Sequence, residues 1–398
     1  MADIKPFTAV RFGGNNVSKL ICPPYDIISD KARKKLTKSS LFNFVRLELP
    51  EPKGSIDKYE NAAAILTSWL EKGVLARDNA PSFYIYEQVF SDHGKKMVRR
   101  GFFAALKLEK PGAGGVKPHE KTLAKPKEDR LNLIRAVRAN LSPIFGLYGD
   151  KGKVTVKLFA KISKTDPVSS ARDSDGVIHK LWQAGNPADT NLLRKALKSQ
   201  NVFIADGHHR YETAWNYSQE CGVSGYCGCG YVMTFLCPME DQGLSIWPTH
   251  RVVELPRDFD TRINKYFDVL PASIFKKCET KLPQVLLLYR NGKMAALKIK
   301  NSKILSQFMP DKCKSYRELG VSVLHSVLLH DVAPDKITYV KDEKEAVALA
   351  KKRGMAAVIV PATPIEAVKK IALAGQTMPQ KSTYFYPKVA SGMAVYAL

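Results

Sequence analysis

The sequence contains no long apolar run and no pattern typical of an exported or disulfide-stapled protein. No stretch approaches the run of about 18 apolar residues that a membrane span needs, and the polar start MADIKPFTAVRFGG lacks a signal-peptide core. The seven cysteines are an odd number in a chain of 398 residues, which argues for reduced thiols. Cys227 and Cys229 have no second Cys or His pair at zinc-finger spacing. We therefore expect a cytoplasmic protein without a membrane span.

Several nucleotide-binding and DNA-binding signatures are also missing. The sequence has no Walker A pattern and no glycine loop of the protein-kinase type, so an ordinary ATP enzyme is not indicated. It has no helix-turn-helix pattern, internal repeat or low-complexity segment. The net charge of +24 would favour polyanionic partners if it were concentrated, but the lysines are scattered among apolar positions. This distribution favours a solvated basic surface over a dedicated nucleic-acid face.

Hydrophobic periodicity predicts a mixed α/β protein with more than one lobe. A composition of 45% hydrophobic and 25% charged residues is ordinary for a soluble globular chain of this length. Strands are predicted at residues 8–12, 43–49, 83–89, 100–107, 142–148, 202–205, 231–236, 244–247, 284–289, 294–299, 337–340 and 356–360. Helices are predicted at residues 59–72, 178–182, 190–197, 316–329, 343–353 and 364–374, and a further one ends near residue 139. We expect an N-terminal mixed part (1–110), a core (111–254) and a C-terminal α/β lobe (255–398) whose tail returns to the site.

One strand-to-helix junction, residues 202–217, is the strongest candidate for chemistry. The apolar run VFIA leads into Asp206, Gly207, His208, His209 and Arg210, and apolar residues then recur at helical spacing. A glycine turn at a helix start directs free backbone N–H groups at one point, where the helix dipole favours an anion such as phosphate. The imidazoles and the guanidinium add donors and positive charge. The Asp206 carboxylate either caps the helix or holds a metal ion or a substrate group.

Four other segments carry candidate residues, each with a structural alternative. The two prolines before Tyr25 and Asp26 fix an extended loop, and Asp26 either serves a site or starts the next turn. His119 and Glu120 form an acid/base pair in a polar stretch that is otherwise typical of a solvated helix approach. His250 and Arg251 end a strand, where they either reach a phosphate or lie on the surface. The tail residues Lys381, Ser382 and Lys388 belong to an aromatic edge strand or to a wall over an active site.

The sequence resembles, from end to end, a family of uncharacterised cytoplasmic proteins defined as a domain of unknown function. Five blocks occur in the family's order: PPYD; HEKT followed by DRL; FIADGHHRYETA; PTHR; and MPQKSTYFYPK followed by SG. The DGHHR block is also similar to the corresponding turn of free serine kinases, of the chromosome-partitioning protein ParB and of sulfiredoxins. This resemblance implies a ParB/sulfiredoxin-like nucleotide-binding core with an additional α/β lobe. His208 stands where sulfiredoxin has its catalytic cysteine, which disfavours sulfinic-acid reduction.

The resemblance implies a metal-dependent kinase that forms O-phosphoserine from free L-serine or a similar small hydroxy compound. Glu120, Asp206 and His208 would be catalytic, with Glu120 as general base and Asp206 also as the ligand of Mg²⁺. The phosphoryl donor would be ATP, ADP or pyrophosphate. Its phosphates would be bound by Gly207, His209, Arg210, His250, Arg251, Lys381, Ser382 and Lys388, and the acceptor by Tyr25, Asp26, His119, Thr122 and Arg130.

Two hypotheses from other classes stand beside the kinase. A ParB-like nucleotide switch would bind a nucleotide and respond to DNA, although the helix-turn-helix that such a switch uses is missing. A basic nucleic-acid-binding protein would bind RNA with a strong dependence on salt. The kinase is favoured because the DGHHR block is the most specific of the motifs. A homodimer is compatible with every one of these hypotheses.

Overall fold

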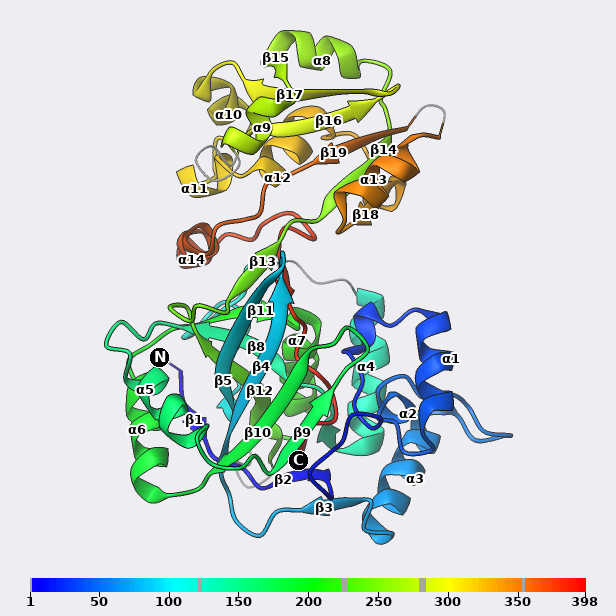
Figure 1. Ribbon diagram of the computed structural model, residues 1–398, viewed down its shortest axis with the longest axis vertical. Helices are drawn as coiled ribbons and strands as arrows, with labels where there is room; N and C mark the ends of the chain where they lie inside the picture. The colour runs from blue at the N-terminus through cyan, green and yellow to red at the C-terminus, as the bar shows by residue number, and fades with distance from the viewer. Residues whose placement is uncertain (1, 121–123, 223–227, 279–283, 353–354) are drawn as a thin grey trace. The chain divides into compact units, whose positions relative to one another are not determined.

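The computed structural model describes residues 2–120, 124–222, 228–278, 284–352 and 355–398. Helices and strands alternate along the chain, which confirms the predicted mixed α/β class (Figure 1). The chain forms two compact units, and unit 2 is inserted in the sequence of unit 1. Unit 1 comprises Met1–Pro118, Thr122–Ser245 and Pro387–Leu398, and unit 2 comprises His119–Lys121 and Ile246–Tyr386. Among the described residues, no helix combines the length and the apolar character that crossing a membrane requires.

A large, mostly antiparallel sheet forms the centre of unit 1. Among the described residues its order is β6 (Val116–Lys117), β11 (Val202–Asp206), β8 (Ile144–Tyr148), β12 (Tyr231–Pro238), β5 (Lys95–Lys107), β4 (Phe83–Asp92), β10 (Ile178–Ala184) and β9 (Ser169–Arg172), with β1 (Ile4–Lys5) paired to β5. Two neighbouring pairs run parallel, β11 with β6 and β12 with β8. The end of β11, where the candidate turn begins, therefore lies beside β8.

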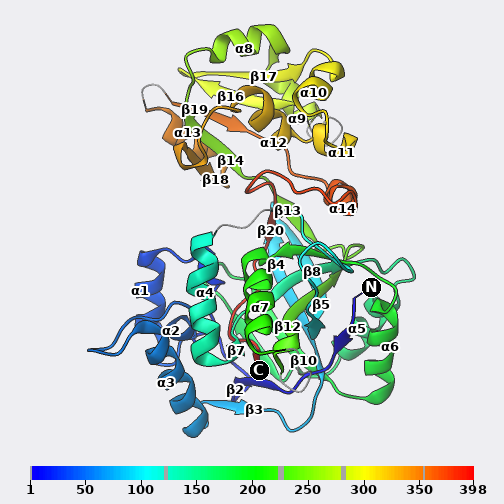
Figure 2. The ribbon, with the colours of Figure 1, turned by 180° about the vertical axis from the view of Figure 1, so that it is seen from behind.

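Helices cover this sheet because each presents an apolar stripe to it. Leu158 of α5 (Val154–Ile162), Leu193 of α6 (Pro187–Leu197) and Tyr211 of α7 (His208–Glu220) join strand residues in one buried core. Figure 2 shows α7 next to α4 (Ala124–Val137) over the sheet. The remaining helices of this unit are α1 (Asp30–Ser39), α2 (Val45–Glu48), α3 (Lys58–Glu71), η1 (Tyr25–Ile27) and η2 (Gly228–Gly230). Of these, α3 packs against α4.

A smaller sheet joins the two ends of the chain within unit 1. Its order is β3 (Leu75–Arg77), β2 (Ala9–Phe12), β21 (Val395–Ala397) and β7 (Ala139–Asn140). Ala9 and Val10 pair antiparallel with Tyr396 and Val395. The segment after unit 2, which includes Lys388, is thus fixed in unit 1 by the backbone pairing of β21 with β2.

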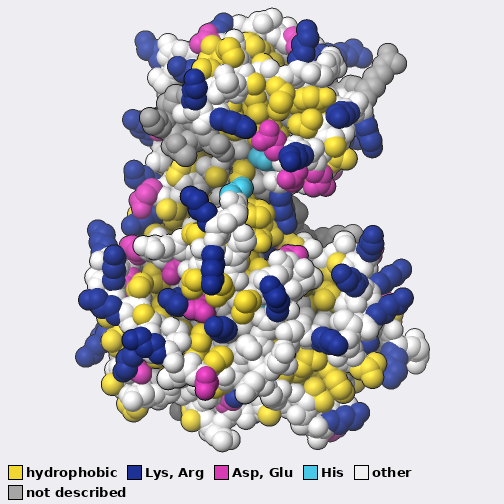
Figure 3. All heavy atoms as spheres, in the orientation of Figure 1, with side chains coloured by type: hydrophobic (Ala, Val, Ile, Leu, Met, Phe, Trp, Pro, Cys, Tyr) yellow, Lys and Arg dark blue, Asp and Glu magenta, His cyan; other side chains and the backbone are white. Residues whose placement is uncertain are grey.

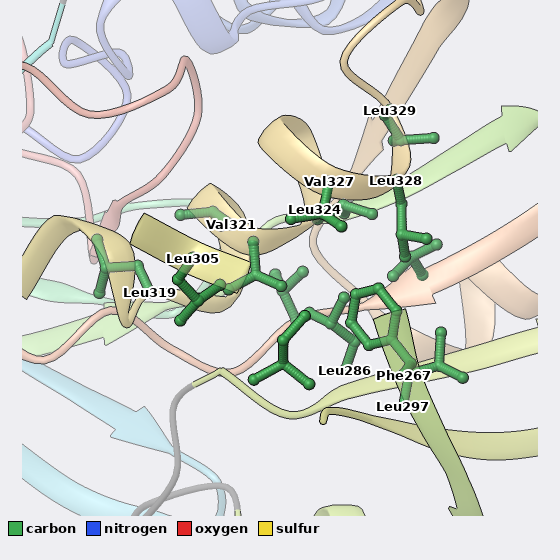
Figure 4. Packing of buried hydrophobic residues seen from close by; sticks show 14 of the residues in the cluster. Phe267, Leu286, Leu297, Leu305, Leu319, Val321, Leu324, Val327, Leu328 and Leu329 are labelled. Atoms are coloured by element: carbon green, nitrogen blue, oxygen red, sulfur yellow. The ribbon is translucent and has the colours of Figure 1, made fainter. Parts of the chain in front are cut away.

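Unit 2 is built on a second antiparallel sheet with helices on both faces. The order is β15 (Phe267–Pro271), β17 (Lys293–Ile299), β16 (Leu286–Arg290), β19 (Met355–Ile359), β14 (His250–Glu254) and β18 (Ile337–Val340). One face carries the larger core, in which Phe267, Leu286 and Leu297 of the strands point toward leucines and valines of the helices (Figure 4). The other face packs Val285, Leu287 and neighbours against α13 (Glu343–Ala350). These two layers confirm the predicted α/β pattern beyond residue 258.

The other elements of unit 2 connect or cover these strands. They are α8 (Phe259–Tyr266), α9 (Ser273–Cys278), α10 (Ser302–Phe308), α11 (Lys314–Arg317), α12 (Gly320–Val323), the π-helical η3 (Leu324–Leu328), η4 (Pro334–Lys336) and α14 (Ile365–Leu373). In addition, β13 (Ser245–Trp247) pairs with β20 (Tyr384–Tyr386), at the places where the chain enters and leaves the unit. The helix predicted over residues 316–329 is therefore broken into three short pieces.

Two predicted elements are wrong. Residues 43–49 alternate like a strand but contain the short helix α2, because the Asn43 side chain accepts a hydrogen bond from the Val45 N–H at 3.0 Å, and this local bond competes with strand pairing. Residues 178–182 were predicted as a helix but belong to strand β10, which pairs along its whole length with β4. Buried His179 and Leu181 lie on one face of that strand. The segment 178–182 is too short for its apolar residues to distinguish a strand from a helix.

Candidate functional site

Gly207 makes the bend between β11 and α7. Its φ of 87° lies in the left-handed region that favours glycine, and a Cβ there would lie 3.0 Å from the Arg210 guanidinium. Among the described residues, no side chain caps the 13-residue helix α7. The helix thus begins without a side-chain cap, and anion binding at this helix start stays a prediction.

Asp206, at the end of β11, lies between two cations. Arg210 Nη2 donates to Asp206 Oδ2 at 2.7 Å, and Lys388 Nζ donates to Asp206 Oδ1. Burial alone would raise the pKa of this carboxyl, but the charges of Lys388, Arg210 and His208 outweigh burial and hold the pKa well below its usual range. Asp206 is therefore a permanent anion inside a positively charged cluster, and His208 is buried beside it at the start of α7.

Both carboxylate oxygens of Asp206 already accept a hydrogen bond, one from Arg210 and one from Lys388. This pairing competes with its predicted role as the ligand of Mg²⁺. Among the described residues, no group of three or more His, Cys, Asp or Glu side chains is arranged to hold a metal ion. In this arrangement Asp206 is better suited to pair with cationic side chains than to bind magnesium, because Lys388 and Arg210 repel a further cation. Its metal role stays a prediction, and no step below depends on it.

Strands β4 and β5 hold the backbone that carries Lys388. Gln88 Nε2 donates to the Lys388 carbonyl at 2.9 Å, and Arg99 Nη2 donates to the Pro387 carbonyl. The Arg99 guanidinium is fully buried, lies 4.8 Å from the centre of the Phe145 ring and also bonds to Gln88. Arg99 and Gln88 thus fix the position from which the Lys388 ammonium reaches Asp206.

The loop of Pro23, Pro24, Tyr25 and Asp26 contributes to the same part of unit 1. The Arg130 guanidinium lies 4.3 Å from the centre of the Tyr25 ring, a cation–π contact. Burial raises the pKa of Tyr25 to about 12, so its hydroxyl stays protonated. Asp26 is exposed. Burial alone would lower the pKa of Arg210, but the charges of Asp206 and Asp26 raise it above its usual value. The prediction that this loop presents side chains to a site stays open, but Tyr25 and Arg130 do lie together.

Glu48 is a carboxylate that sequence analysis missed. It is 1% exposed, and its Oε1 accepts hydrogen bonds from the Tyr25 N–H at 3.2 Å and from Ser142 Oγ at 2.9 Å. Its Oε2 is buried and accepts no hydrogen bond from any described residue. Burial raises the pKa of Glu48, although the charges of Arg130 and Arg210 oppose the shift. No sequence signal pointed to it, because the segment was predicted as a strand.

Glu48 lines a small pocket of about 50 Å³ beside the turn. Polar side chains of the lining come from α2, α4 and α7 and from the loop before β8, and apolar ones come mainly from α4 and the neighbouring strands. The lining residues are Glu48, Arg130, Leu133, Ile134, Ala139, Asn140, Leu141, Ser142, Arg210, Thr213 and Val232. Arg210 belongs both to this lining and to the ion pair with Asp206. The pocket and the predicted anion site at the start of α7 therefore share a residue.

The other predicted site residues lie in unit 2, around the segment 379–383. The fully buried Arg251 donates to the carbonyls of Gln380 at 3.0 Å and Lys381 at 3.2 Å, and burial lowers its pKa to about 10. Ser382 Oγ donates to the Pro379 carbonyl, and His119 Nε2 lies 3.1 Å from Thr383 Oγ1.

His250 and Glu120 complete this group. His250 Nδ1 accepts the Val360 N–H at 3.3 Å, and Glu120 forms a β-bridge with Met378. The structure thus groups the predicted residues in two sets. Asp206, Gly207, His208, Arg210, Lys388, Tyr25, Asp26 and Arg130 are in unit 1 together with His209, whereas His119, Glu120, His250, Arg251, Lys381 and Ser382 are in unit 2. Thr122 lies outside the described residues.

A protein-family comparison identifies the chain. Residues 4–322 match the family described as "Protein of unknown function (DUF1015)". The chain belongs to this family. The match covers the PPYD, DGHHR and PTHR blocks, which confirms the family predicted from them, whereas the link to ParB and sulfiredoxin stays a prediction. No curated protein matches the chain.

Several solved structures are similar over most of their length at low identity. Free serine kinase in complex with AMP is 12% identical, with 68% of this chain and 83% of the kinase covered and a TM-score of 0.34. SbnI with a C-terminal truncation, from Staphylococcus aureus, is 11% identical, with 74% and 87% covered and a TM-score of 0.41. A conserved hypothetical protein from Pyrococcus furiosus is 14% identical, with 71% and 92% covered and a TM-score of 0.35. At these values the likeness carries no conclusion about activity.

Proposed function

We propose that the protein is a phosphotransferase that phosphorylates a small hydroxy compound, with free L-serine as the first acceptor to test. The observation that carries the proposal is the position of Arg210, which borders the uncapped start of α7 and also lines the pocket that contains Glu48. Phosphoryl transfer requires positive charge around the phosphates and a carboxylate near the attacking hydroxyl. The two parts of unit 1 that share Arg210 offer these two features.

In this proposal the donor phosphates bind at the start of α7. The backbone N–H groups of the first helical turn donate to the phosphate oxygens, and the left-handed Gly207 leaves room for them, because a side chain there would point at Arg210. Lys388 and Arg210 balance the phosphate charge while Asp206 keeps both side chains in place. His208 and His209 add imidazole donors at the same end of the helix.

Two carboxylates are candidates for the general base. Glu120 is the residue implied by the resemblance to free serine kinases. Glu48 is the candidate from geometry, since it lines the pocket next to the turn and a buried carboxyl with a raised pKa accepts a proton more readily near neutral pH. Mg²⁺, if the donor brings it, would supply charge neutralisation at the phosphates, and the chain's own residues would orient donor and acceptor.

The test is an assay of the full chain with Mg²⁺, L-serine and ATP, ADP or pyrophosphate, with O-phosphoserine detected by mass spectrometry. We expect serine-dependent product with at least one donor, and loss of about 99% or more of the turnover in Arg210→Gln and Asp206→Asn. Arg135→Gln is the matched control, because Arg135 forms a similar ion pair with Glu220 on the exposed side of α4. Absence of turnover with every donor would contradict the proposal.

No specific observation favours a second function. Lys and Arg side chains are scattered over the face drawn in Figure 3 and do not gather into one patch. A nucleic-acid interface would instead show a continuous basic stripe.

A further inference from the structure

A second cavity of unit 1 lies between α6 and β1, which contact each other (Figure 1). Its volume is about 410 Å³, which is within the range of small-molecule sites. The described residues that line it are Ala2, Asp3, Ile4, Asn191, Arg194, Lys195 and Lys198. None of them lines the pocket of Glu48 or belongs to the Gly207 turn. The cavity is therefore separate from the site described above.

Both walls of this cavity are fixed to the core of unit 1. On the strand side, Ile4 pairs antiparallel with Leu106 of β5. The Ala2 N–H donates to the Gln200 carbonyl, just beyond α6, at 3.1 Å. On the helix side, Leu193 is buried in the same hydrophobic core as Ala2 and Ile4. The cavity is thus preformed, and a ligand would bind without first having to order its walls.

The polar side chains of α6 at this cavity form one positively charged stripe. The spacing i, i+3, i+4 and i+7 places on one face of the helix Asn191, Arg194, Lys195 and Lys198. Among the described residues, none of the three cations forms an ion pair with an Asp or Glu side chain. Like charges four residues apart, such as Arg194 and Lys198, destabilise a helix. A bound anion would relieve this repulsion.

Two nearby negative groups do not balance the three cations. The carboxyl end of the α6 dipole is equivalent to about half a negative charge, which by itself favours basic residues in the last turn. The Asp3 carboxylate adds one full charge. The cations exceed both together, so the cavity keeps a net positive charge. Stabilisation of the helix end therefore does not use the whole stripe, and the surplus charge is available to an anion.

The lining also restricts the chemistry of that anion. Among the described lining residues there is no aromatic ring on which a base could stack, and the apolar Ala2 and Ile4 are at most 4% exposed. Guanidinium and ammonium groups both donate to phosphate oxygens. We propose that the cavity binds a small anion with several phosphate charges, held by the three cations of α6. This inference goes beyond the proposed function and does not depend on it.

Calorimetry with the full chain at fixed ionic strength tests the proposal. We expect inorganic tripolyphosphate to bind at least about tenfold more tightly than orthophosphate, because it offers charge to all three cations. The double variant Arg194→Gln/Lys198→Gln should lose about tenfold or more in tripolyphosphate affinity. Lys34→Gln/Lys35→Gln removes the same charge from exposed side chains of α1 and, as the matched control, should change this affinity less than about twofold. Equal losses in the two double variants, or equal affinities for the two anions, would overturn the proposal.

Hydrogen exchange locates the bound anion without a substitution at the cavity. We expect tripolyphosphate to slow the exchange of α6 and β1, because a ligand that contacts both elements stabilises them against local opening. Should the start of α7 also bind tripolyphosphate, Arg210→Gln removes the protection of α7 and leaves that of α6. Protection confined to α7, or no protection of any element, would contradict the proposal.

Discussion

Lys388 and Asp206 form an ion pair although 182 residues separate them in the chain. Unit 2 occupies most of that interval, so the pair joins the segment that precedes the insertion to the segment that follows it. The lysine is held by its backbone through Gln88 and Arg99, and the aspartate is held at the end of a sheet strand. Two independently fixed ends make the pair part of a rigid structure.

The first prediction concerns this pair. Lys388→Met keeps the length of the side chain and leaves the half-buried Asp206 paired with Arg210, so we expect a loss of about 3 kcal/mol in the free energy of unfolding. Urea denaturation measures it. Lys314→Met is the control, because the exposed Lys314–Glu318 pair is separated by 3.8 Å and is expected to contribute less than about 0.5 kcal/mol. Similar losses in both variants would contradict the structural role of Lys388.

The second prediction concerns Gly207. Gly207→Ala places a Cβ in the left-handed region and 3.0 Å from the Arg210 guanidinium, so it should cost about 1–2 kcal/mol for the backbone and also displace Arg210. Gly94→Ala, at φ 81° with open space around it, is the matched control for the backbone cost alone. We expect only Gly207→Ala to weaken anion binding, measured by calorimetry with pyrophosphate. An unchanged pyrophosphate affinity in Gly207→Ala would mean that the Gly207 turn does not bind the phosphate.

The third prediction concerns pH and unit 2. Burial, together with the charge of Arg251, lowers the pKa of His250 to about 4 and that of His325 to about 3. The unfolded chain binds these protons below about pH 6.5 while the native unit does not, so stability falls as pH drops from 6.5 to 4, by about 1.4 kcal/mol per pH unit for each histidine. Hydrogen exchange of β14 and β19 reports the loss.

Variants separate the histidines from other acid effects. His250→Gln and His325→Gln should each flatten the slope of stability against pH, while His93→Gln, whose side chain is 86% exposed in unit 1, should not. A slope that is the same in all three variants would show that the buried histidines do not cause the acid sensitivity.

The fourth prediction concerns Asn43. Its amide donates to the carbonyls of Lys19 at 2.8 Å and Ile21 at 3.1 Å and its Oδ1 accepts from the Val45 N–H, so Asn43→Ala should cost about 2–3 kcal/mol and disturb Glu48. Asn186→Ala removes only the exposed cap of α6 and should cost about 1 kcal/mol. Chemical denaturation compares the two. Equal losses of stability in the two variants would mean that the hydrogen bonds donated by the buried Asn43 amide contribute no more than the exposed helix cap of Asn186.

Sequence periodicity predicted the elements that bury one clear face. The strands at β4, β5 and β12 and the helix α3, with its apolar residues one turn apart, lie close to their predicted ranges. The sequence failed at α2, where a local hydrogen bond from the Val45 N–H to the Asn43 side chain outweighs an alternating pattern, and that error concealed Glu48. The Gly207 turn could be predicted because glycine and charged residues are neighbours in the sequence. The ion pair of Asp206 with Lys388 could not be predicted, although both residues were assigned to one site, because no local pattern encodes a contact across 182 residues.

The pairing of β2 with β21 has a consequence for synthesis. During translation β2 emerges long before its partner, and the ribosome must complete all of unit 2 before Lys388 and β21 leave the exit tunnel. A nascent chain stalled anywhere within unit 2 therefore carries the Asp206 turn without its lysine. Any activity that needs this ion pair therefore requires synthesis to continue past Lys388.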